Sequence, residues 1–323
     1  MGIAGSSPAR RTMSRLDYSK STVFFRDSFV SFSSANLSIA SSPVLYGLAI
    51  YTVFSLNWNS KEKKLYIFRL EDHYKRLVNS AKIMDFNSFE KSWNYHKFEK
   101  MVLELIKKNN LTEDALVRVS IFVDAVIAGT KIRGLPNSLC AYIYPMGEIL
   151  PKTGINVCVS SWVRNADNAI PARAKVNGGY VNSSLMKNEA IVNGYDDAIA
   201  LDQKGNVTEG TVANLFFVKD GKLITPSVNF DILEGITRDS LIKIARDLKI
   251  EVIERAVSRS EMYIAEEAFV CGSSARITPI LSIDRRMIGG GKIGKITEKL
   301  SKKYEQIQRG EVKEYKDWRI GLS

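Results

Sequence analysis

The spacing of hydrophobic residues in the first half of the chain predicts alternating helices and strands. Residues 69–85 place apolar side chains on one helical face, and a second amphipathic helix covers residues 98–106. Apolar and polar residues alternate over 117–121, which is the period of a half-buried strand. A further strand is expected over residues 140–144. The first half is therefore of mixed α and β type.

The second half carries more turn signals between its apolar segments. Residues 197–202 and 213–218 have the character of strands, and Asp220-Gly221 after the second is a strong hairpin signal. Thr237 is expected to cap a helix that carries its apolar face as far as Leu248. The whole chain is therefore predicted to have a mixed α/β (α+β) fold.

Glycine and proline residues suggest where the chain divides. Four of them fall within ten residues, which is typical of a linker. The segment before residue 17 is rich in Ser, Ala and Arg and lacks the apolar core of a secretory signal. We therefore expect a flexible N-terminal leader, a small α/β domain, an interdomain linker and a larger domain, over residues 1–16, 17–144, 145–154 and 155–323.

Composition and charge exclude several classes of protein. The chain has 323 residues, of which 45% are hydrophobic and 25% charged, as in ordinary globular proteins. Its longest apolar run, 43–54, is about half the length of a transmembrane helix, so no membrane association is expected. The formal net charge of +11 invites a nucleic-acid function, but the basic residues near the C-terminus alternate with acidic ones, as on a solvated helix face. No nucleic-acid partner is therefore predicted.

Histidine and cysteine are too scarce for a metal centre or a disulfide framework. The small number of histidines, only His73 and His96, excludes a multi-histidine metal site and argues against a histidine-based triad. The three cysteines are far apart in the sequence, which favours a reducing compartment such as the cytoplasm. Any chemistry must therefore use other groups.

Four motifs in one order point to such a chemistry. They are K-V-N-G-G-Y-V-N-S-S at 175–184, E-G-T-V-A-N-L at 209–215, E-G-I-T-R-D at 234–239 and F-V-C-G-S-S-A-R-I-T-P at 269–279. With them the chain resembles the class IV aminotransferases, the pyridoxal 5'-phosphate (PLP) enzymes of fold type IV, and the branched-chain amino acid aminotransferases look most similar. The resemblance implies a small and a larger domain with the cofactor in the cleft between them.

The resemblance implies roles for three residues around the reactive end of the cofactor. Lys175 matches the lysine that forms a Schiff base with PLP and then moves the α-proton of the substrate, for which its pKa must be lowered. Glu209 matches the carboxylate that faces the pyridine nitrogen and keeps it protonated. Tyr180 matches the tyrosine that hydrogen-bonds the phenolic oxygen of the cofactor.

The resemblance also implies a phosphate-binding group. Arg76 matches the phosphate arginine of the family, and the segment 235–237 opens a predicted helix whose free N–H groups would face an anion. Ser273 stands where the family usually has a threonine. The cofactor-binding residues implied in this way are Arg76, Tyr180, Glu209, Leu233, Gly235, Ile236, Thr237 and Ser273.

The residues expected around the substrate differ more from the pattern of the branched-chain enzymes than the cofactor-binding residues do. Thr52 and Val53 replace the usual Glu-Gly of an F-E-G element, and Tyr51 with Val53 gives a Tyr-x-Val pattern similar to the (R)-selective amine transaminases. Arg118 favours amino acids over plain amines, and Arg133 either binds a substrate carboxylate or faces solvent. The substrate-binding residues implied by the resemblance are Tyr46, Tyr51, Arg118, Arg133 and Ser274.

The expected reaction moves the amino group of a branched-chain or other hydrophobic L-amino acid to 2-oxoglutarate. A D-amino acid or (R)-amine transaminase and a 4-amino-4-deoxychorismate lyase of the same fold remain as alternatives. The family builds each site beside a dimer interface, so the resemblance implies a homodimer or a larger assembly of dimers. The expected small-molecule partners are amino acids and 2-oxo acids.

Overall fold

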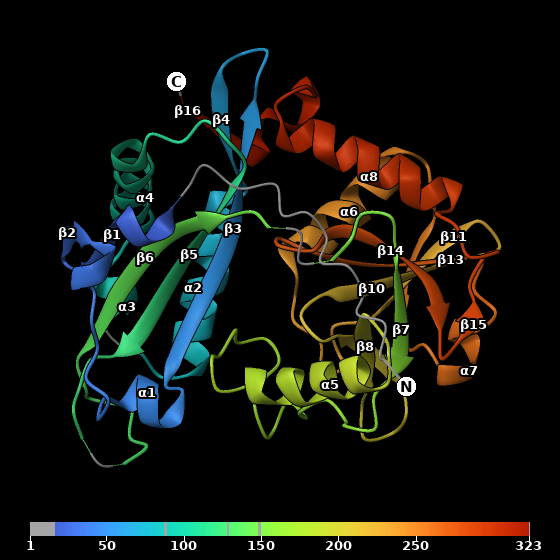
Figure 1. Ribbon diagram of the computed structural model, residues 1–323, viewed down its shortest axis with the longest axis horizontal. Helices are drawn as coiled ribbons and strands as arrows, with labels where there is room; N and C mark the ends of the chain where they lie inside the picture. Colours follow the sequence, from blue (N-terminus) through green and yellow to red (C-terminus); the bar gives the residue numbers. More distant parts are fainter. Residues whose placement is uncertain (1–16, 87–88, 128, 148–149, 323) are drawn as a thin grey trace, which may run out of the picture.

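Two β-sheets with separate hydrophobic cores form the framework of the chain. The structure is a computed structural model that describes residues 17–86, 89–127, 129–147 and 150–322. The expected leader, 1–16, lies outside the described residues. Figure 1 shows the first sheet on the left and the second on the right, each with its own helices.

The first sheet has the strand order β16-β4-β3-β5-β6-β1-β2, and every pairing in it is antiparallel. Its strands are β1 (Thr22–Arg26), β2 (Ser28–Ser31), β3 (Ala49–Asn59), β4 (Lys64–Phe68), β5 (Ala115–Val123), β6 (Asn137–Pro145) and β16 (Arg319–Leu322). The helices before and between these strands are α1 (Ser42–Tyr46), α2 (Leu70–Ile83), α3 (Phe89–Ser92) and α4 (Tyr95–Asn109). The strand predicted over 140–144 lies within β6, and both predicted helices are confirmed as α2 and α4.

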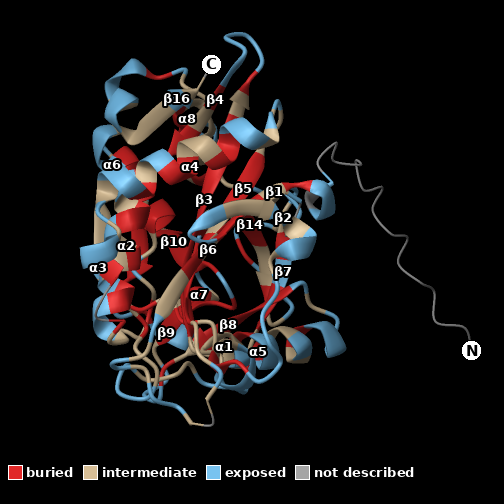
Figure 2. Ribbon diagram, turned by 90° about the vertical axis from the view of Figure 1, so that its left-hand side faces the viewer, coloured by how far each residue is buried: buried red, intermediate tan, exposed pale blue. Residues whose placement is uncertain are grey.

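Helices α2 and α4 cover one face of the first sheet. Leu77 of α2 and Leu105 of α4 share a single apolar cluster with Phe54 of β3, and all three are fully buried. The apolar stripes read from the sequence thus face this core, because burial of those stripes removes their surface from water. Figure 2 shows the central strands buried and the outward sides of the helices exposed.

The strand predicted to be half-buried, β5, is in fact covered on both faces. Val117, Val119 and Ile121 pack toward the helices, while Leu116 belongs to a cluster on the opposite face. Arg118, on that second face, is only partly exposed. The polar face of β5 therefore looks toward the second sheet rather than toward bulk solvent.

The second sheet has the order β12-β11-β10-β13-β14-β7-β8-β9, with β15 paired to β14. Its strands are β7 (Ile155–Val159), β8 (Asp197–Leu201), β9 (Val207–Gly210), β10 (Asn214–Lys219), β11 (Lys222–Pro226), β12 (Val252–Arg255), β13 (Glu267–Gly272), β14 (Arg276–Ile283) and β15 (Arg286–Met287). The associated helices are α5 (Tyr180–Val192), α6 (Ile236–Asp247), α7 (Arg259–Met262) and α8 (Lys295–Gln308). The hairpin predicted at Asp220-Gly221 is confirmed as the β10–β11 turn.

The second sheet curves around its own core. Ile155 of β7, Val207 of β9 and Phe217 of β10 belong to one cluster although their strands are far apart in the sheet order. On the outer side, α6 and α8 pack against β10 and β13. Across the described residues, no helix is long and apolar enough to span a bilayer.

The chain passes from the first sheet to the second between β6 and β7. β6 ends at Pro145 and β7 begins at Ile155, so we propose 145–154 as the domain boundary. The C-terminal strand β16 departs from the expected division, because it returns to the first sheet and pairs with β4. Residues 319–322 thus tie the end of the chain to the smaller unit.

Candidate active site

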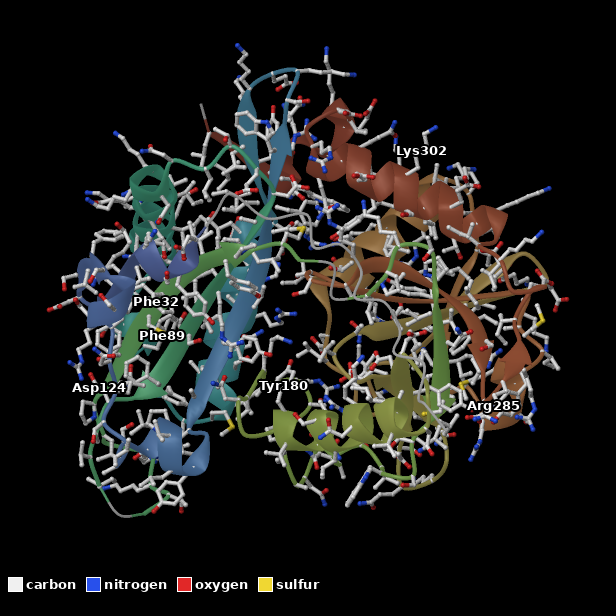
Figure 3. All side chains as sticks on the ribbon, viewed as in Figure 1. Phe32, Phe89, Asp124, Tyr180, Arg285 and Lys302 are labelled. Carbon is white, nitrogen blue, oxygen red and sulfur yellow. The ribbon has the colours of Figure 1, made fainter. Side chains whose placement is uncertain are left out.

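A pocket lies between the two sheets and is lined by both of them. The first sheet contributes Tyr51 and Val53 from β3, with Arg118 from β5. The second contributes Glu209 and residues near the start of α6. The loop that follows β7 runs between the sheets and supplies Lys175, and Figure 3 places Tyr180 at the same junction. Residues distant in sequence therefore meet at this pocket.

Backbone hydrogen bonds fix the position of Lys175. Its carbonyl oxygen accepts from the Tyr51 N–H at 3.0 Å, and the Asn177 N–H donates to the Ala49 carbonyl at 2.8 Å. The Lys175 N–H donates to the Ser80 hydroxyl of α2 at 3.2 Å. The loop therefore lies along the start of β3 like a short extra strand, and the Lys175 backbone is held by the first sheet.

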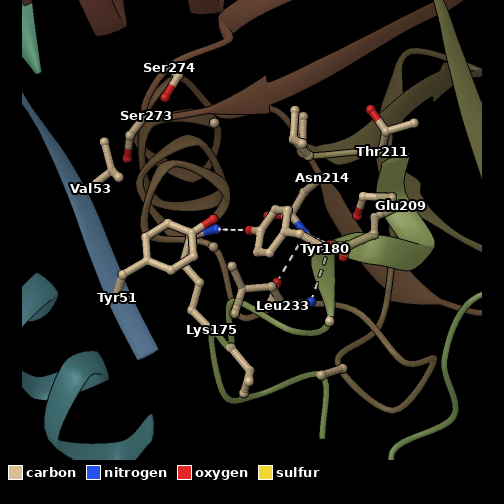
Figure 4. A pocket seen from close by; sticks show the side chains of 18 of the residues that line it. Tyr51, Val53, Lys175, Tyr180, Glu209, Thr211, Asn214, Leu233, Ser273 and Ser274 are labelled. Carbon is tan, nitrogen blue, oxygen red and sulfur yellow. Dashed lines mark hydrogen bonds between the residues drawn. The ribbon is translucent and has the colours of Figure 1, made fainter. Parts of the chain in front are cut away.

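The side chain of Lys175 ends between two tyrosine rings. Its Nζ lies 2.5 Å from the Tyr180 hydroxyl and 4.9 Å from the centre of the Tyr51 ring. Figure 4 shows this contact as a dashed line between Lys175 and Tyr180. Tyr180 is the first residue of α5, so the five-residue spacing in the sequence corresponds to the end of a loop and the start of a helix.

The surroundings of this pair change its proton affinities. Burial lowers the pKa of Lys175, and the charge of Arg76 lowers it further, while Tyr180 acts in the opposite direction. Burial alone would raise the pKa of Tyr180, but the Lys175 ammonium and hydrogen bonds from Lys175 and Tyr51 bring the net pKa below its ordinary value. Because only the unprotonated amine is nucleophilic, a lowered lysine pKa suits Lys175 for attack on a carbonyl carbon.

Glu209 is buried and held by three donors. The Arg164 Nη2 lies 2.5 Å from its Oε1, while the Asn214 side-chain amide and the Leu233 N–H donate to its Oε2 at 3.0 and 3.1 Å. Asn214 also donates to the Leu233 carbonyl at 3.0 Å. These bonds fix the carboxylate in one orientation at the wall of the pocket.

A cationic group lies at the start of α6. Helix α6 begins at Ile236 after Gly235, and among the described residues no side chain caps its first N–H groups. Arg76 reaches this point from α2, where its Nη1 donates to the Glu234 carbonyl at 3.4 Å. Its Nε is buried without a hydrogen-bond partner among the described residues, and burial lowers the pKa of the guanidinium to about 10. The free N–H groups at the start of α6 and the unpartnered Nε of Arg76 together form a site for an anion.

Arg118 lies against Tyr51 on the side of the pocket formed by the first sheet. Its guanidinium carbon is 3.5 Å from the centre of the Tyr51 ring, and it donates to the Asn177 side-chain oxygen at 3.1 Å. Val53 is paired with Arg118 in the β3–β5 register, and Tyr144 of β6 completes this wall. The wall thus combines apolar and aromatic surface with one positive charge.

The structure brings together most of the residues that the sequence singled out. Those lining the pocket are Tyr51, Arg76, Arg118, Lys175, Tyr180, Glu209, Leu233, Gly235, Ile236, Thr237, Ser273 and Ser274. Thr237 lies inside the first turn of α6 rather than at its cap, because the helix begins at Ile236 with Gly235 at the cap position. The Thr237 hydroxyl lies 3.3 Å from the Tyr304 hydroxyl.

Two expected substrate residues lie outside the pocket of this chain. Tyr46, at the end of α1, is exposed, and its hydroxyl accepts from the Gly129 N–H. Arg133 is 76% exposed and pairs with Asp85 at 2.5 Å. Of the two interpretations of Arg133, the chain by itself shows the solvent-facing one, because the side chain is exposed and does not line the pocket.

Two residues with clear roles in the pocket were not anticipated. Asn214 is part of the E-G-T-V-A-N-L motif, so the motif itself contained the signal for it. Arg164 lies in an irregular loop between β7 and Lys175, and no periodicity or motif in the sequence marks it. Its role depends on the loop geometry that brings it to Glu209.

Comparison with known proteins identifies the family. Residues 52–283 match the family model for class IV aminotransferases. The chain is 40% identical over 304 residues to a probable branched-chain-amino-acid aminotransferase of Aquifex aeolicus, covering 93% of this chain and 96% of that protein. It is 35% identical to the branched-chain-amino-acid aminotransferase of Escherichia coli strain K12, covering 95% and 98% of the two chains.

Solved structures show the same relationship. A branched-chain aminotransferase from Thermoproteus uzoniensis with norvaline superposes with a TM-score of 0.88 at 34% identity, covering 94% of this chain and 99% of that one. The PLP form of the branched-chain amino acid aminotransferase from Thermobaculum terrenum gives a TM-score of 0.89 at 32% identity, covering 95% and 99%. The chain therefore belongs to the class IV aminotransferases of fold type IV, and it is an aminotransferase that uses pyridoxal 5'-phosphate.

Proposed function

We propose that this chain transfers the amino group of branched-chain L-amino acids to 2-oxoglutarate, and that Lys175 is its catalytic residue. The observation that carries the assignment of Lys175 is its position: Nζ projects into the pocket, 2.5 Å from Tyr180, with its pKa lowered by burial. The substrate class rests on the relatives, which are named branched-chain aminotransferases at 33–40% identity over most of the chain.

The pocket residues fit the cofactor. The buried Nε of Arg76, which lacks a partner among the described residues, and the uncapped start of α6 suit the phosphate dianion. Glu209 would hold the protonated pyridine nitrogen, and Tyr180 the phenolic oxygen. Ser273, which also lines the pocket, would add a hydroxyl at the phosphate. When bound, the cofactor supplies an electron sink for the carbon that carries the substrate amino group.

The residues of the chain then have separate tasks. Lys175 would hold the carbonyl carbon of the cofactor through its Nζ, and the same Nζ, as a free amine, would take the proton from the substrate Cα. The Tyr180 hydroxyl, in contact with Nζ, would stabilise the charge that Lys175 gains at that moment. Arg164 would keep the Glu209 carboxylate oriented. Each task requires only groups already in contact in the pocket.

The wall near Arg118 supports the choice of substrates. Tyr51, Val53 and Tyr144 offer aromatic and apolar surface, which favours a branched aliphatic side chain. Arg118 supplies a cation for a carboxylate, as an amino acid or 2-oxoglutarate requires. The (R)-amine alternative keeps one specific observation in its favour, because Tyr51 and Val53, which form the Tyr-x-Val pattern, both line the pocket.

Substrate assays on the purified holoenzyme test this proposal. L-Leucine, L-isoleucine and L-valine would each be offered with 2-oxoglutarate, alongside D-alanine and (R)-1-phenylethylamine, and glutamate formation would be measured. We expect turnover with the branched-chain L-amino acids at rates at least tenfold above the other two. Faster turnover of the D-amino acid or the amine would overturn the substrate assignment. Release of pyruvate from aminodeoxychorismate would instead identify the lyase.

The attachment of the cofactor has its own test. Borohydride reduction of the holoenzyme followed by peptide mass spectrometry should place the pyridoxyl mass on the peptide containing Lys175. The matched control is Lys187, a lysine of α5 that pairs with Asp197 and does not line the pocket. Labelling at any residue other than Lys175 would contradict its assignment.

We also propose a homodimer in the cytoplasm. The face around α1 exposes Ile39, Val44, Leu45 and Val126, and Tyr46 lies on the same helix. Several large apolar side chains exposed on and near one short helix are typical of an interface, and a second copy docked there would cover Tyr46. The three cysteines carry no disulfide, which suits a reducing compartment. Light scattering of the purified protein should give twice the mass of 36.2 kDa or a multiple of it.

A further inference from the structure

A buried polar group links β3 to α2 behind the pocket. The Thr52 Oγ1 lies 2.8 Å from the His73 Nδ1 and 3.3 Å from the Arg76 Nη2. Thr52 and His73 are 0% and 1% exposed, and the His73 ring packs 5.6 Å from that of Phe54. Two polar side chains are therefore buried in an apolar core, directly beside the arginine that reaches the pocket.

The direction of these hydrogen bonds follows from the chemistry of the three groups. A guanidinium has donors only, so Arg76 donates and the Thr52 oxygen accepts. The hydroxyl proton of Thr52 then needs an acceptor, and the His73 Nδ1 is the one within hydrogen-bond distance among the described residues. His73 must therefore be neutral, with its proton on Nε2. Burial and the charges of Arg76, Arg69 and Lys175 favour the same state, because they hold the pKa of His73 well below its ordinary value.

This arrangement orients Arg76 without reducing its charge. A carboxylate at either of these two positions would pair with the guanidinium and neutralise it, but neither Thr52 nor His73 carries a negative charge. With a neutral hydroxyl and a neutral imidazole instead, Arg76 forms no ion pair with any carboxylate among the described residues. Its positive charge therefore remains available to an anion at the start of α6.

We propose that Thr52 and His73 are positioning residues, which hold the Arg76 guanidinium toward the phosphate of the cofactor. Arg76 donates a hydrogen bond to Thr52, and Thr52 donates one to His73. The inference rests on the proposed role of Arg76 as the phosphate ligand. Neither Thr52 nor His73 needs to touch the cofactor, since both act through Arg76.

A comparison of PLP with pyridoxal, which lacks the phosphate, separates positioning from a general structural role. The full chain would be freed of cofactor by dialysis and titrated with each compound, and the dissociation constants would be taken from absorption spectra. Thr52→Val removes the hydroxyl at nearly constant volume, and Thr52→Ser retains it. We expect Thr52→Val to weaken PLP binding about tenfold, as for loss of a hydrogen bond to a charged group, while pyridoxal binding changes less than about twofold.

The conservative variant and a competitor complete the test. Thr52→Ser should bind PLP within about twofold of the unchanged protein, and inorganic phosphate should compete with pyridoxal phosphate less effectively in Thr52→Val than in Thr52→Ser. His73→Phe should weaken PLP binding in the same selective way, because phenylalanine has no acceptor to orient the Thr52 hydroxyl. An equal loss of PLP and pyridoxal binding in Thr52→Val would overturn the positioning role.

Arg76→Gln distinguishes failure of this inference from failure of the proposed function. If Arg76→Gln weakens PLP binding selectively and Thr52→Val does not, Arg76 still binds the phosphate but Thr52 does not position it. If Arg76→Gln weakens PLP and pyridoxal equally, the phosphate is bound elsewhere, and both the assignment of Arg76 and the role of Thr52 are wrong.

Discussion

The guanidinium of Arg164 lies 2.5 Å from the Glu209 carboxylate, and both side chains are largely buried. A buried ion pair is costly to break, because removal of one partner leaves the other charge in a medium that solvates it poorly. Glu209 retains two neutral donors, Asn214 and the Leu233 N–H, but no second cation pairs with it among the described residues. The pair therefore links an irregular loop to the carboxylate at the pocket wall.

Arg164→Gln should lower the free energy of unfolding by about 3 kcal/mol, since it leaves Glu209 without its cation. Arg173→Gln is the matched control, because Arg173 lies in the same loop and pairs with Glu234 at the surface. Exposed pairs contribute less than about 1 kcal/mol. Urea unfolding of both variants measures the difference. Equal decreases in the free energy of unfolding would show that the buried Arg164–Glu209 pair stabilises the protein no more than an exposed pair.

Tyr180→Phe should reduce kcat/KM about tenfold, because it removes the hydroxyl that contacts the Lys175 Nζ. Tyr263→Phe removes a hydroxyl bonded to Asp284, far from the lining of the pocket, and serves as the control. Steady-state kinetics with L-leucine and 2-oxoglutarate would show the contrast. Unchanged kinetics in Tyr180→Phe would mean that its contact with Lys175 plays no part in proton transfer.

The buried His73 should make the protein less stable in acid. Its folded pKa lies well below the ordinary value of 6.5, so below about pH 6.5 the unfolded chain binds a proton that the folded chain does not. Stability is thus fully present above the unfolded pKa and is lost as the pH falls. For one such group, the free energy of unfolding should fall by about 1.4 kcal/mol between pH 7.5 and pH 5.5.

Replacement of each histidine isolates this contribution. Between pH 7.5 and pH 5.5, the free energy of unfolding of His73→Gln should fall by about 1.4 kcal/mol less than that of the unchanged protein. Urea unfolding at one protein concentration measures both values. His96, which is exposed on α4, provides the control, and His96→Gln should follow the unchanged protein. The prediction fails if the two variants show the same dependence on pH.

Gly235→Ala should weaken PLP binding and destabilise the protein, because an added Cβ would lie 2.0 Å from the Asn214 Oδ1. Asn214 in turn holds Glu209, so the clash reaches two parts of the pocket. Overpacking of this kind costs roughly 1–3 kcal/mol. Gly147→Ala is the control, since open space surrounds that position. Thermal unfolding and PLP titration of the two variants would reveal any difference, and similar values would contradict the predicted clash.

The sequence predicted the helices, turns and motif residues of the site better than the residues that contact them. The amphipathic stripe of α2 and the Asp220-Gly221 turn follow local rules of spacing and backbone geometry, so both were found in place. Lys175, Glu209 and Tyr180 were identified through motifs, and the structure brings them into one pocket. Arg164 was missed because its partner is 45 positions away, and the path of an irregular loop leaves no periodic signal.

Other differences arise from packing between distant parts of the chain. The alternation over 117–121 predicted a half-buried strand, but the second sheet covers the polar face of β5, and this packing brings Arg118, which was expected at the site, to the pocket lining. Thr52 was noted only as a departure from a family pattern. Its contacts with His73 and Arg76 depend on α2 packing on β3, which no local pattern encodes.

The sequence by itself determined the identity of the family, the helices and strands with strong periodicity, and the lysine, glutamate and tyrosine of the motifs, because those signals are carried by neighbouring residues. Only the tertiary structure decided which charges are paired and which remain free: Glu209 with Arg164, Arg133 with Asp85, and Arg76 beside neutral Thr52 and His73. The physical reason is that burial and partner distance set the energy of a charge, and both depend on how two separate sheets come together around the pocket.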